Sequence, residues 1–239
     1  MANNIKHYIP NTLTCLNLLS GCLAVVCAFS PFDSIAGIYG YQAAFCMILS
    51  GAFFDFLDGF FARVLKETSP IGADLDSLSD MITFGLAPSM ILLNLFKAAG
   101  CSLPMQLVCL LIPLCGALRL ARFNVYFIGK SSFSGLPIPS GALFCIGLAD
   151  IMVSQSGFNP YAAAGCTALV ALLMIAPLPM YSLKFKSFSL RRNVAGWLLV
   201  AVSAACVIIW GWTGFLFAIV YYVLSSFVIF FYRHSSGRS

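Results

Sequence analysis

Long apolar runs, separated by short polar or proline-containing stretches, follow one another along the whole chain. Eight of these runs are long enough to form helices, at about 11–30, 41–65, 74–96, 103–127, 137–155, 160–180, 194–211 and 213–232. Prolines fall where we expect the first helix to open and close and the third and fifth to begin: Pro10, Pro31, Pro70 and Pro137. About 20 apolar residues span the hydrocarbon core of a bilayer. The pattern therefore predicts an all-α integral membrane protein, a bundle of about eight transmembrane helices.

The composition supports this prediction. Of the 239 residues, 61% are hydrophobic and only 9% are charged, and the mean hydropathy is +0.96. A soluble domain carries about 25% charged residues, so an ordinary soluble domain is excluded. Eight helices with short connections use up the length of the chain. We therefore expect a single transmembrane domain over residues 1–239.

The basic residues are distributed unevenly between the two sides of the predicted bundle. If the N-terminus is cytoplasmic, Lys97 falls outside and twelve others fall on the cytoplasmic side: Lys6, Arg63, Lys66, Arg119, Arg122, Lys130, Lys184, Lys186, Arg191, Arg192, Arg233 and Arg238. Cytoplasmic loops carry the excess of Lys and Arg in membrane proteins. We therefore expect both termini in the cytoplasm, and the cell inner membrane as location if the protein is bacterial. The net charge of +5 suits a rim beside anionic lipid headgroups and requires no nucleic acid.

Acidic residues are concentrated in one window. The chain has 8 of them, and most lie between positions 55 and 80: Asp55, Asp58, Glu67, Asp74, Asp76 and Asp80. Residues three or four apart on a helix share a face, so Asp55 pairs with Asp58, and Asp76 pairs with Asp80. Two antiparallel helices could bring both pairs into one volume, where carboxylates repel unless they share protons or hold a cation. Oxygen ligands select a hard ion, and we expect Mg²⁺ or Mn²⁺, with Ca²⁺ as an alternative.

The depth of these acids points to function. Asp55 lies eight residues before Arg63, which puts it about 12 Å inward from the cytoplasmic interface at the rise of an α-helix. A carboxylate at that depth is costly unless it lines a polar cavity or binds an ion. One alternative is a divalent-cation carrier without enzymatic activity. A carrier should have ionisable residues near the midplane of several helices, whereas these acids occupy one level that faces the cytoplasm.

The fixed positions of this window form one motif: Asp55-x-x-Asp58-Gly59-x-x-Ala62-Arg63, eight residues, then Gly72-x-x-x-Asp76-x-x-x-Asp80. The motif resembles the signature of the CDP-alcohol phosphotransferase family at every position. The resemblance implies a six-helix core at about 10–180, with two further helices at about 194–232, and a homodimer. It also implies a reaction in which an alcohol hydroxyl attacks the lipid-bearing phosphate of a CDP-linked donor and CMP leaves.

The same resemblance assigns roles to residues of this chain. It implies that four aspartates hold one or two divalent ions, and that the last of them is also the catalytic base: Asp55, Asp58, Asp76 and Asp80. It further implies that residues around the acids bind the CDP-linked donor: Gly59, Arg63, Ser69, Asn11 and Thr14. Helix capping is the alternative role for Asn11 and Thr14, which lie near the start of the first helix. Close helix packing is the alternative for Gly59.

Three further stretches, 79–89, 117–124 and 133–139, are similar to the phosphatidylserine synthase branch of the family. This similarity implies CDP-diacylglycerol as the donor and L-serine as the acceptor. Serine carries a carboxylate, which the fork of an arginine binds in bidentate fashion. We therefore expect Arg122, with Arg119 and Asn124 as further candidates, to bind serine, unless the arginines only anchor the helix at the interface. A sister enzyme that uses glycerol phosphate or inositol phosphate is the alternative, and its acceptor would need a larger basic pocket.

Overall fold

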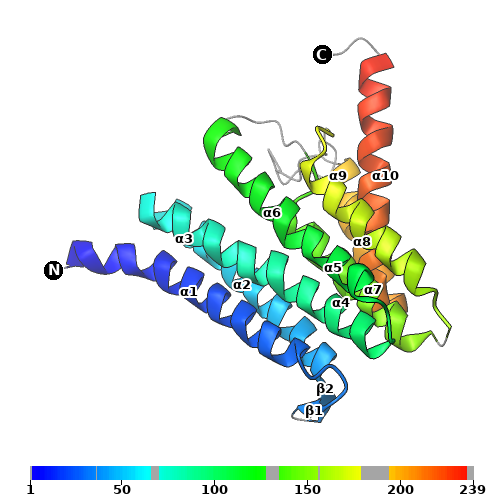
Figure 1. Ribbon diagram of the computed structural model, residues 1–239. Helices are drawn as coiled ribbons and strands as arrows, with labels where there is room; N and C mark the ends of the chain where they lie inside the picture. Colours follow the sequence, from blue (N-terminus) through cyan, green and yellow to red (C-terminus); the bar gives the residue numbers. More distant parts are fainter. Residues whose placement is uncertain are drawn as a thin grey trace.

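The computed structural model describes residues 2–35, 37–65, 70–127, 135–155, 157–178 and 194–235. Its first two helices, α1 (Ala2–Ala28) and α2 (Gly40–Leu65), lie side by side over most of their length (Figure 1). A short antiparallel hairpin of β1 (Ser34–Ile35) and β2 (Ile38–Tyr39) joins them. The two helices are therefore antiparallel, and the end of α2 returns to the level of the start of α1.

The third helical stretch runs without a break through three segments: α3 (Pro70–Asp80), the π-helical η1 (Met81–Leu86) and α4 (Ala87–Ala98). Two hydroxyls tie it to α1. Ser79 Oγ donates to the Thr14 carbonyl at 3.2 Å, and Thr83 Oγ1 donates to the Asn17 carbonyl at 3.0 Å. Buried hydroxyls need such partners in an apolar interior. The bonds fix the face that α3 presents to α1, and Asp80 lies directly before the π-helical turn.

The remaining helices complete the bundle around α7, whose side chains are mostly buried. In chain order they are α5 (Leu103–Leu107), η2 (Val108–Leu110), α6 (Leu111–Arg122), η3 (Phe123–Phe127), α7 (Ile138–Ser154), α8 (Pro160–Ile175), α9 (Val194–Trp210), η5 (Gly211–Thr213) and α10 (Gly214–Ser235). Helix α7 packs against α4, α8 and α10. Figure 1 shows α10 at the edge of the bundle, on the side away from α1 and α2.

Apolar side chains occupy both the interior and the outer surface. Phe45, Phe84 and Ile146 are among the fully buried side chains of the core, whereas Phe53 is 59% exposed and Ile208 is 83% exposed. A broad apolar surface is unfavourable in contact with water, but it is favourable in contact with lipid. The distribution therefore agrees with an all-α membrane protein.

The helical stretches agree with the sequence prediction in most places. Five helical stretches in the described part of the chain are long and apolar enough to cross a membrane: Tyr8–Ala28, Gly40–Leu65, Ile71–Ala98, Leu103–Val125 and Gly196–Val228. The last of these contains the bend between α9 and α10, while α7 and α8 are shorter apolar helices. The all-α membrane fold is confirmed at this level, and the count of eight crossings stays a prediction.

One predicted boundary is wrong. Helix α1 begins at Ala2 and contains Pro10, instead of starting near residue 11. Proline lacks one backbone N–H and disturbs the preceding turn, but the helix resumes when the residues on both sides keep helical geometry. Thr14 Oγ1 lies 3.0 Å from the carbonyl oxygen of Pro10, within the same helix. Pro70 and Pro137, in contrast, lie at the starts of α3 and α7 as predicted.

Candidate active site

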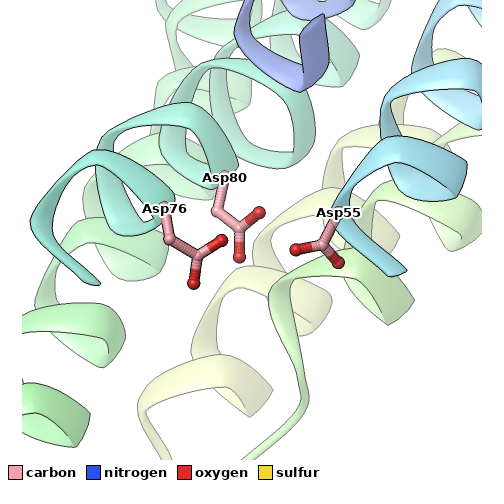
Figure 2. Close-up of side chains that lie close together, drawn as sticks. All are labelled: Asp55, Asp76 and Asp80. Carbon is pink, nitrogen blue, oxygen red and sulfur yellow. The ribbon is translucent and has the colours of Figure 1, made fainter. Parts of the chain in front are cut away.

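Three aspartates from two helices meet in one place. Asp55 comes from α2, and Asp76 and Asp80 come from successive turns of α3, so their side chains share a face. Figure 2 shows the three carboxylates turned toward one another across the gap between the two helices. One oxygen of each lies within 4.8 Å of the others, and all three residues are partly buried. This is the convergence that the spacing of the motif predicts.

The donor set fits a divalent cation. Asp76 Oδ1 is buried and has no hydrogen-bond partner among the described residues. A buried carboxylate oxygen without a partner is costly, and three carboxylates at this distance repel one another. A hard cation with oxygen ligands would satisfy both conditions, as Mg²⁺ and Mn²⁺ do in other proteins. The residues present therefore fit the expected metal.

Asp58, the fourth acid of the motif, lies outside this group of three. Its side chain is buried, with 7% exposed, and Oδ2 accepts a hydrogen bond from Thr14 Oγ1 at 2.6 Å. Asp58 stands one turn after Asp55 on α2, and its carboxylate is held toward α1. The structure therefore brings three of the four predicted ligands together and gives the fourth a hydroxyl partner.

Helix α1 contributes side chains to the site beside those of α2 and α3. Thr14 is 3% exposed and holds Asp58, and the partly buried Asn11 lies one turn before it. Asn17 is fully buried, and its Nδ2 donates to Asp80 Oδ1 at 3.3 Å, while its Oδ1 has no partner in the described part of the chain. We did not predict Asn17 as a site residue. The available signal was an amide three positions after Thr14 in an apolar run, which puts both on one helix face.

Two of the donor-binding candidates, Gly59 and Arg63, lie at the end of α2. A methyl group built at Gly59 would meet the Arg63 guanidinium at 4.0 Å and, beyond its own helix backbone, no nearer atom of the described residues. This open space does not match close helix packing, and glycine lets a ligand approach the backbone. Arg63 is exposed, and its Nε donates to the Gly59 carbonyl at 2.8 Å. Ser69 lies outside the described residues.

The two candidate arginines on α6 have different surroundings. Arg119 is partly buried and lies within electrostatic range of the Asp80 carboxylate. Arg122 is exposed, and its Nη1 donates to the Ile175 carbonyl at the end of α8, at 3.4 Å. Asn124 Nδ2 donates to Ser77 Oγ at 2.9 Å and so connects η3 to the helix that carries Asp76 and Asp80. The structure therefore brings Arg119, rather than Arg122, toward the acids.

Known proteins are similar to this chain in sequence. The family model described as CDP-alcohol phosphatidyltransferase matches residues 7–207. A CDP-diacylglycerol–serine O-phosphatidyltransferase of Methanocaldococcus jannaschii is 36% identical over 169 residues, which are 70% of this chain and 71% of the relative. An enzyme of the same name from Bacillus subtilis is 33% identical over 172 residues, 71% of this chain and 88% of the relative.

An archaetidylserine synthase of Methanothermobacter thermautotrophicus is 39% identical over a shorter stretch of 137 residues, 56% of this chain and 54% of the relative. The match of the family model extends over most of the chain and includes every acid of the motif. The chain belongs to the CDP-alcohol phosphatidyltransferase family.

Proposed function

We propose that the protein transfers the phosphatidyl group of CDP-diacylglycerol to the hydroxyl of L-serine, which gives phosphatidylserine and CMP. The printed names of the relatives from Methanocaldococcus jannaschii and Bacillus subtilis support the substrates. The observation that carries the proposal is the convergence of Asp55, Asp76 and Asp80, with the Arg119 guanidinium in electrostatic range of Asp80. The Arg119 guanidinium would bind the carboxylate of the acceptor. It lies beside the three aspartate carboxylates, which would hold a metal bound to the diphosphate of the donor.

Asp55, Asp76 and Asp80 would hold the divalent metal, and Asp58 stays the predicted fourth ligand. When bound, the metal supplies the charge neutralisation that transfer of a phosphate group chiefly requires. Thr14 holds the Asp58 carboxylate, and the Asn17 amide holds the Asp80 carboxylate. Because these partners come from α1, that helix keeps the carboxylates in position while substrates exchange.

Asp80 acts as the general base in this proposal. The serine hydroxyl oxygen forms a bond to the phosphorus that carries diacylglycerol, and its proton passes to the Asp80 carboxylate. The bond between this phosphorus and the oxygen shared with CMP breaks, and CMP leaves with the electron pair. Arg119 binds the serine carboxylate, which lies two carbon atoms from the reacting hydroxyl. A short acceptor held at Arg119 therefore presents its hydroxyl to Asp80.

The donor occupies the open face of α2 in this proposal. The nucleotide lies against Gly59, where no side chain intervenes, and Arg63 contacts its phosphates. Asn11 and Thr14 border the nucleotide from α1, and Ser69 is the remaining predicted contact. Arg122 and Asn124 form the rim of the acceptor pocket. Asn124 is placed there because its side chain is hydrogen-bonded to Ser77 of α3.

The site faces the cytoplasm in this proposal, with both termini on that side and eight helices crossing the membrane as one domain. The excess of basic residues on one side of the predicted bundle supports this orientation. In a bacterium the membrane would be the inner membrane, and we also propose a homodimer. Reporter fusions after Lys97 and after the C-terminus test the orientation. An external C-terminus would overturn it.

A CMP-release assay with alternative acceptors tests the reaction. Purified protein with CDP-diacylglycerol and Mn²⁺ or Mg²⁺ should release CMP with L-serine, and chelation of the metal should stop the release. Glycerol 3-phosphate and inositol phosphate are the matched alternative acceptors, because each would need a larger basic pocket than Arg119 provides. Release with one of them and not with serine would identify a sister enzyme. Transport of the cation without any CMP release would identify a carrier.

A further inference from the structure

Three helices meet closely around Thr83, one helical turn from the candidate acids. Thr83 follows Asp80 by three residues in the π-helical η1, and its side chain is completely buried. Its Oγ1 donates to the Asn17 carbonyl of α1 at 3.0 Å, which gives the buried hydroxyl the partner that it needs. The side-chain amide of Asn17 donates to Asp80 Oδ1 at 3.3 Å. Thr83 and Asp80 are therefore both bonded to the same residue of α1.

Two buried glycines, Gly21 of α1 and Gly51 of α2, enclose Thr83. A methyl group built at Gly21 would lie 2.8 Å from the Thr83 Cα. One built at Gly51 would lie 2.5 Å from the Thr83 Cγ2 and 2.9 Å from the Asn17 Oδ1. Non-bonded carbon atoms pack at about 3.5–4.0 Å, so neither position has room for a side chain. Small residues let membrane helices approach closely, and we call Gly21, Gly51 and Thr83 the Thr83 junction.

The Thr83 junction lies one turn from the level of the acids on each of the three helices. Residues three or four apart on a helix share a face, so the two levels are stacked. Each helix contributes one residue to the level of the acids and one to the junction: Asp55 and Gly51 on α2, Asn17 and Gly21 on α1, and Asp80 and Thr83 on α3 and η1. The separation of the acids on α2 and α3 therefore depends on how closely the helices approach at the junction.

Asn17 connects the two levels. Its backbone carbonyl is bonded to Thr83, and its Nδ2 is bonded to Asp80. Its Oδ1 faces Gly51 and has no hydrogen-bond partner in the described part of the chain. Protein interiors are close-packed, so a side chain added at Gly51 must displace the Thr83 methyl group and the Asn17 amide. Because the same amide holds Asp80, this displacement reaches a carboxylate of the candidate metal site.

We propose that the Thr83 junction sets the separation of Asp55 and Asp80, and that Thr83 is a positioning residue for the divalent metal. The close contact of the glycines then serves the geometry of the acids as well as the packing of the helices. The π-helical turn directly after Asp80 agrees with this role, since π-helical turns occur frequently at functional sites. This inference rests on the proposed metal site of the aspartates.

The first test compares Gly51→Ala with Gly147→Ala in the full-length protein. Gly147 is the matched control, because a methyl group built there would lie 2.6 Å from the Leu216 Cβ, at the contact of α7 with α10. Both variants should lower the unfolding temperature. The dissociation constant of Mn²⁺, measured without substrate by electron paramagnetic resonance of the free ion, should rise about 10- to 100-fold in Gly51→Ala only, the range for loss of support of a metal ligand.

The second test concerns the hydroxyl of Thr83. Thr83→Val keeps the shape of the side chain and removes the donor, so the dissociation constant of Mn²⁺ should rise about 3- to 10-fold, the range of one neutral hydrogen bond. Thr83→Ser keeps the hydroxyl and should bind Mn²⁺ nearly as the wild type does. Ser89→Ala is the control, since Ser89 is completely buried in α4 and its hydroxyl donates to the Cys109 carbonyl at 2.8 Å. It should leave Mn²⁺ binding unchanged.

Three results would overturn the inference: unchanged Mn²⁺ binding in folded Gly51→Ala, equal weakening in Gly51→Ala and Gly147→Ala, or equal weakening in Thr83→Val and Thr83→Ser. If Gly51→Ala does not fold, the comparison of the two Thr83 variants decides. Failure of the proposed function is distinguished from these results, because the wild type itself would then bind no Mn²⁺ or release no CMP with serine.

Discussion

Acids inside the bundle occur at two levels, and their surroundings differ. Asp55, Asp76 and Asp80 crowd together near the end of α2, and one of their oxygens has no partner in the described part of the chain. Asp150 of α7 is alone and accepts a hydrogen bond from Thr213. It lies within electrostatic range of Tyr41 at the start of α2, which is 14 residues before Asp55, or about 21 Å along the helix.

The comparison separates two reasons for placing a carboxylate in a membrane. An intramembrane acid is by default a sign of function, but Asp150 has a dedicated hydroxyl and joins α7 to the segment before α10. The three clustered acids repel one another, and a bound divalent cation would relieve this repulsion. Burial alone therefore does not identify the site. The site is identified by the number of neighbouring carboxylates and by the carboxylate oxygen that has no hydrogen-bond partner among the described residues.

The largest expected effect comes from single replacements in the cluster. Asp55→Asn, Asp76→Asn and Asp80→Asn should each reduce kcat by about 10³-fold or more, because several kcal/mol of charge stabilisation depend on the intact ligand set. Measured by CMP release, Asp150→Asn should stay within about 3-fold of the wild type. Addition of Mn²⁺ should raise the unfolding temperature of Asp150→Asn and not that of Asp76→Asn. Near-normal turnover in a cluster variant would remove that residue from the site.

Parts of this site follow directly from the sequence. Four-residue spacing puts Asp76 and Asp80 on one face of α3, and only four residues separate α2 from α3 in the sequence, so the convergence with Asp55 was predictable. The contact of Asp58 with α1 was not predictable, because its partner Thr14 is 44 positions away in the sequence. Spacing gives the faces of one helix, but not which neighbouring helix each face meets.

The same limit applies to the arginines and to the helix start. Arg119 and Arg122 are three residues apart, and the sequence prediction favoured Arg122. The packing of α6 against its neighbours instead turns Arg119 toward Asp80 and leaves Arg122 exposed. Proline usually punctuates helices and therefore predicts a helix start at Pro10, yet α1 continues through it. The choice between the two arginines depends on tertiary contacts that no local pattern contains, whereas Pro10 shows that a proline alone does not set a helix boundary.

A smaller effect is expected where the cluster meets α1. Asn17→Ala removes the amide that donates to Asp80 at 3.3 Å, and loss of such a supporting partner of a metal ligand costs about 10- to 100-fold in activity or metal affinity. The loss should appear in CMP release and in the Mn²⁺ concentration at half-maximal rate. Ser20→Ala is the matched control, since Ser20 is buried one turn later on α1 and its hydroxyl donates to the Leu16 carbonyl. Equal losses in both variants would assign the effect to packing of α1.

The smallest effect is expected at Asp150, and it concerns stability. Asp150→Asn keeps an oxygen that can accept from Thr213 but makes the bond neutral, so the free energy of unfolding should fall by about 1 kcal/mol. Thr213→Val keeps the shape of the side chain and removes the donor, which leaves a buried acceptor unsatisfied, so its loss should be larger. Thermal unfolding in detergent measures both, and the two losses should not add in the double variant, because the residues share one bond. If Asp150→Asn instead abolished CMP release in a protein of normal stability, Asp150 would belong with the clustered acids, and a satisfied hydroxyl partner would no longer distinguish a structural carboxylate from a functional one.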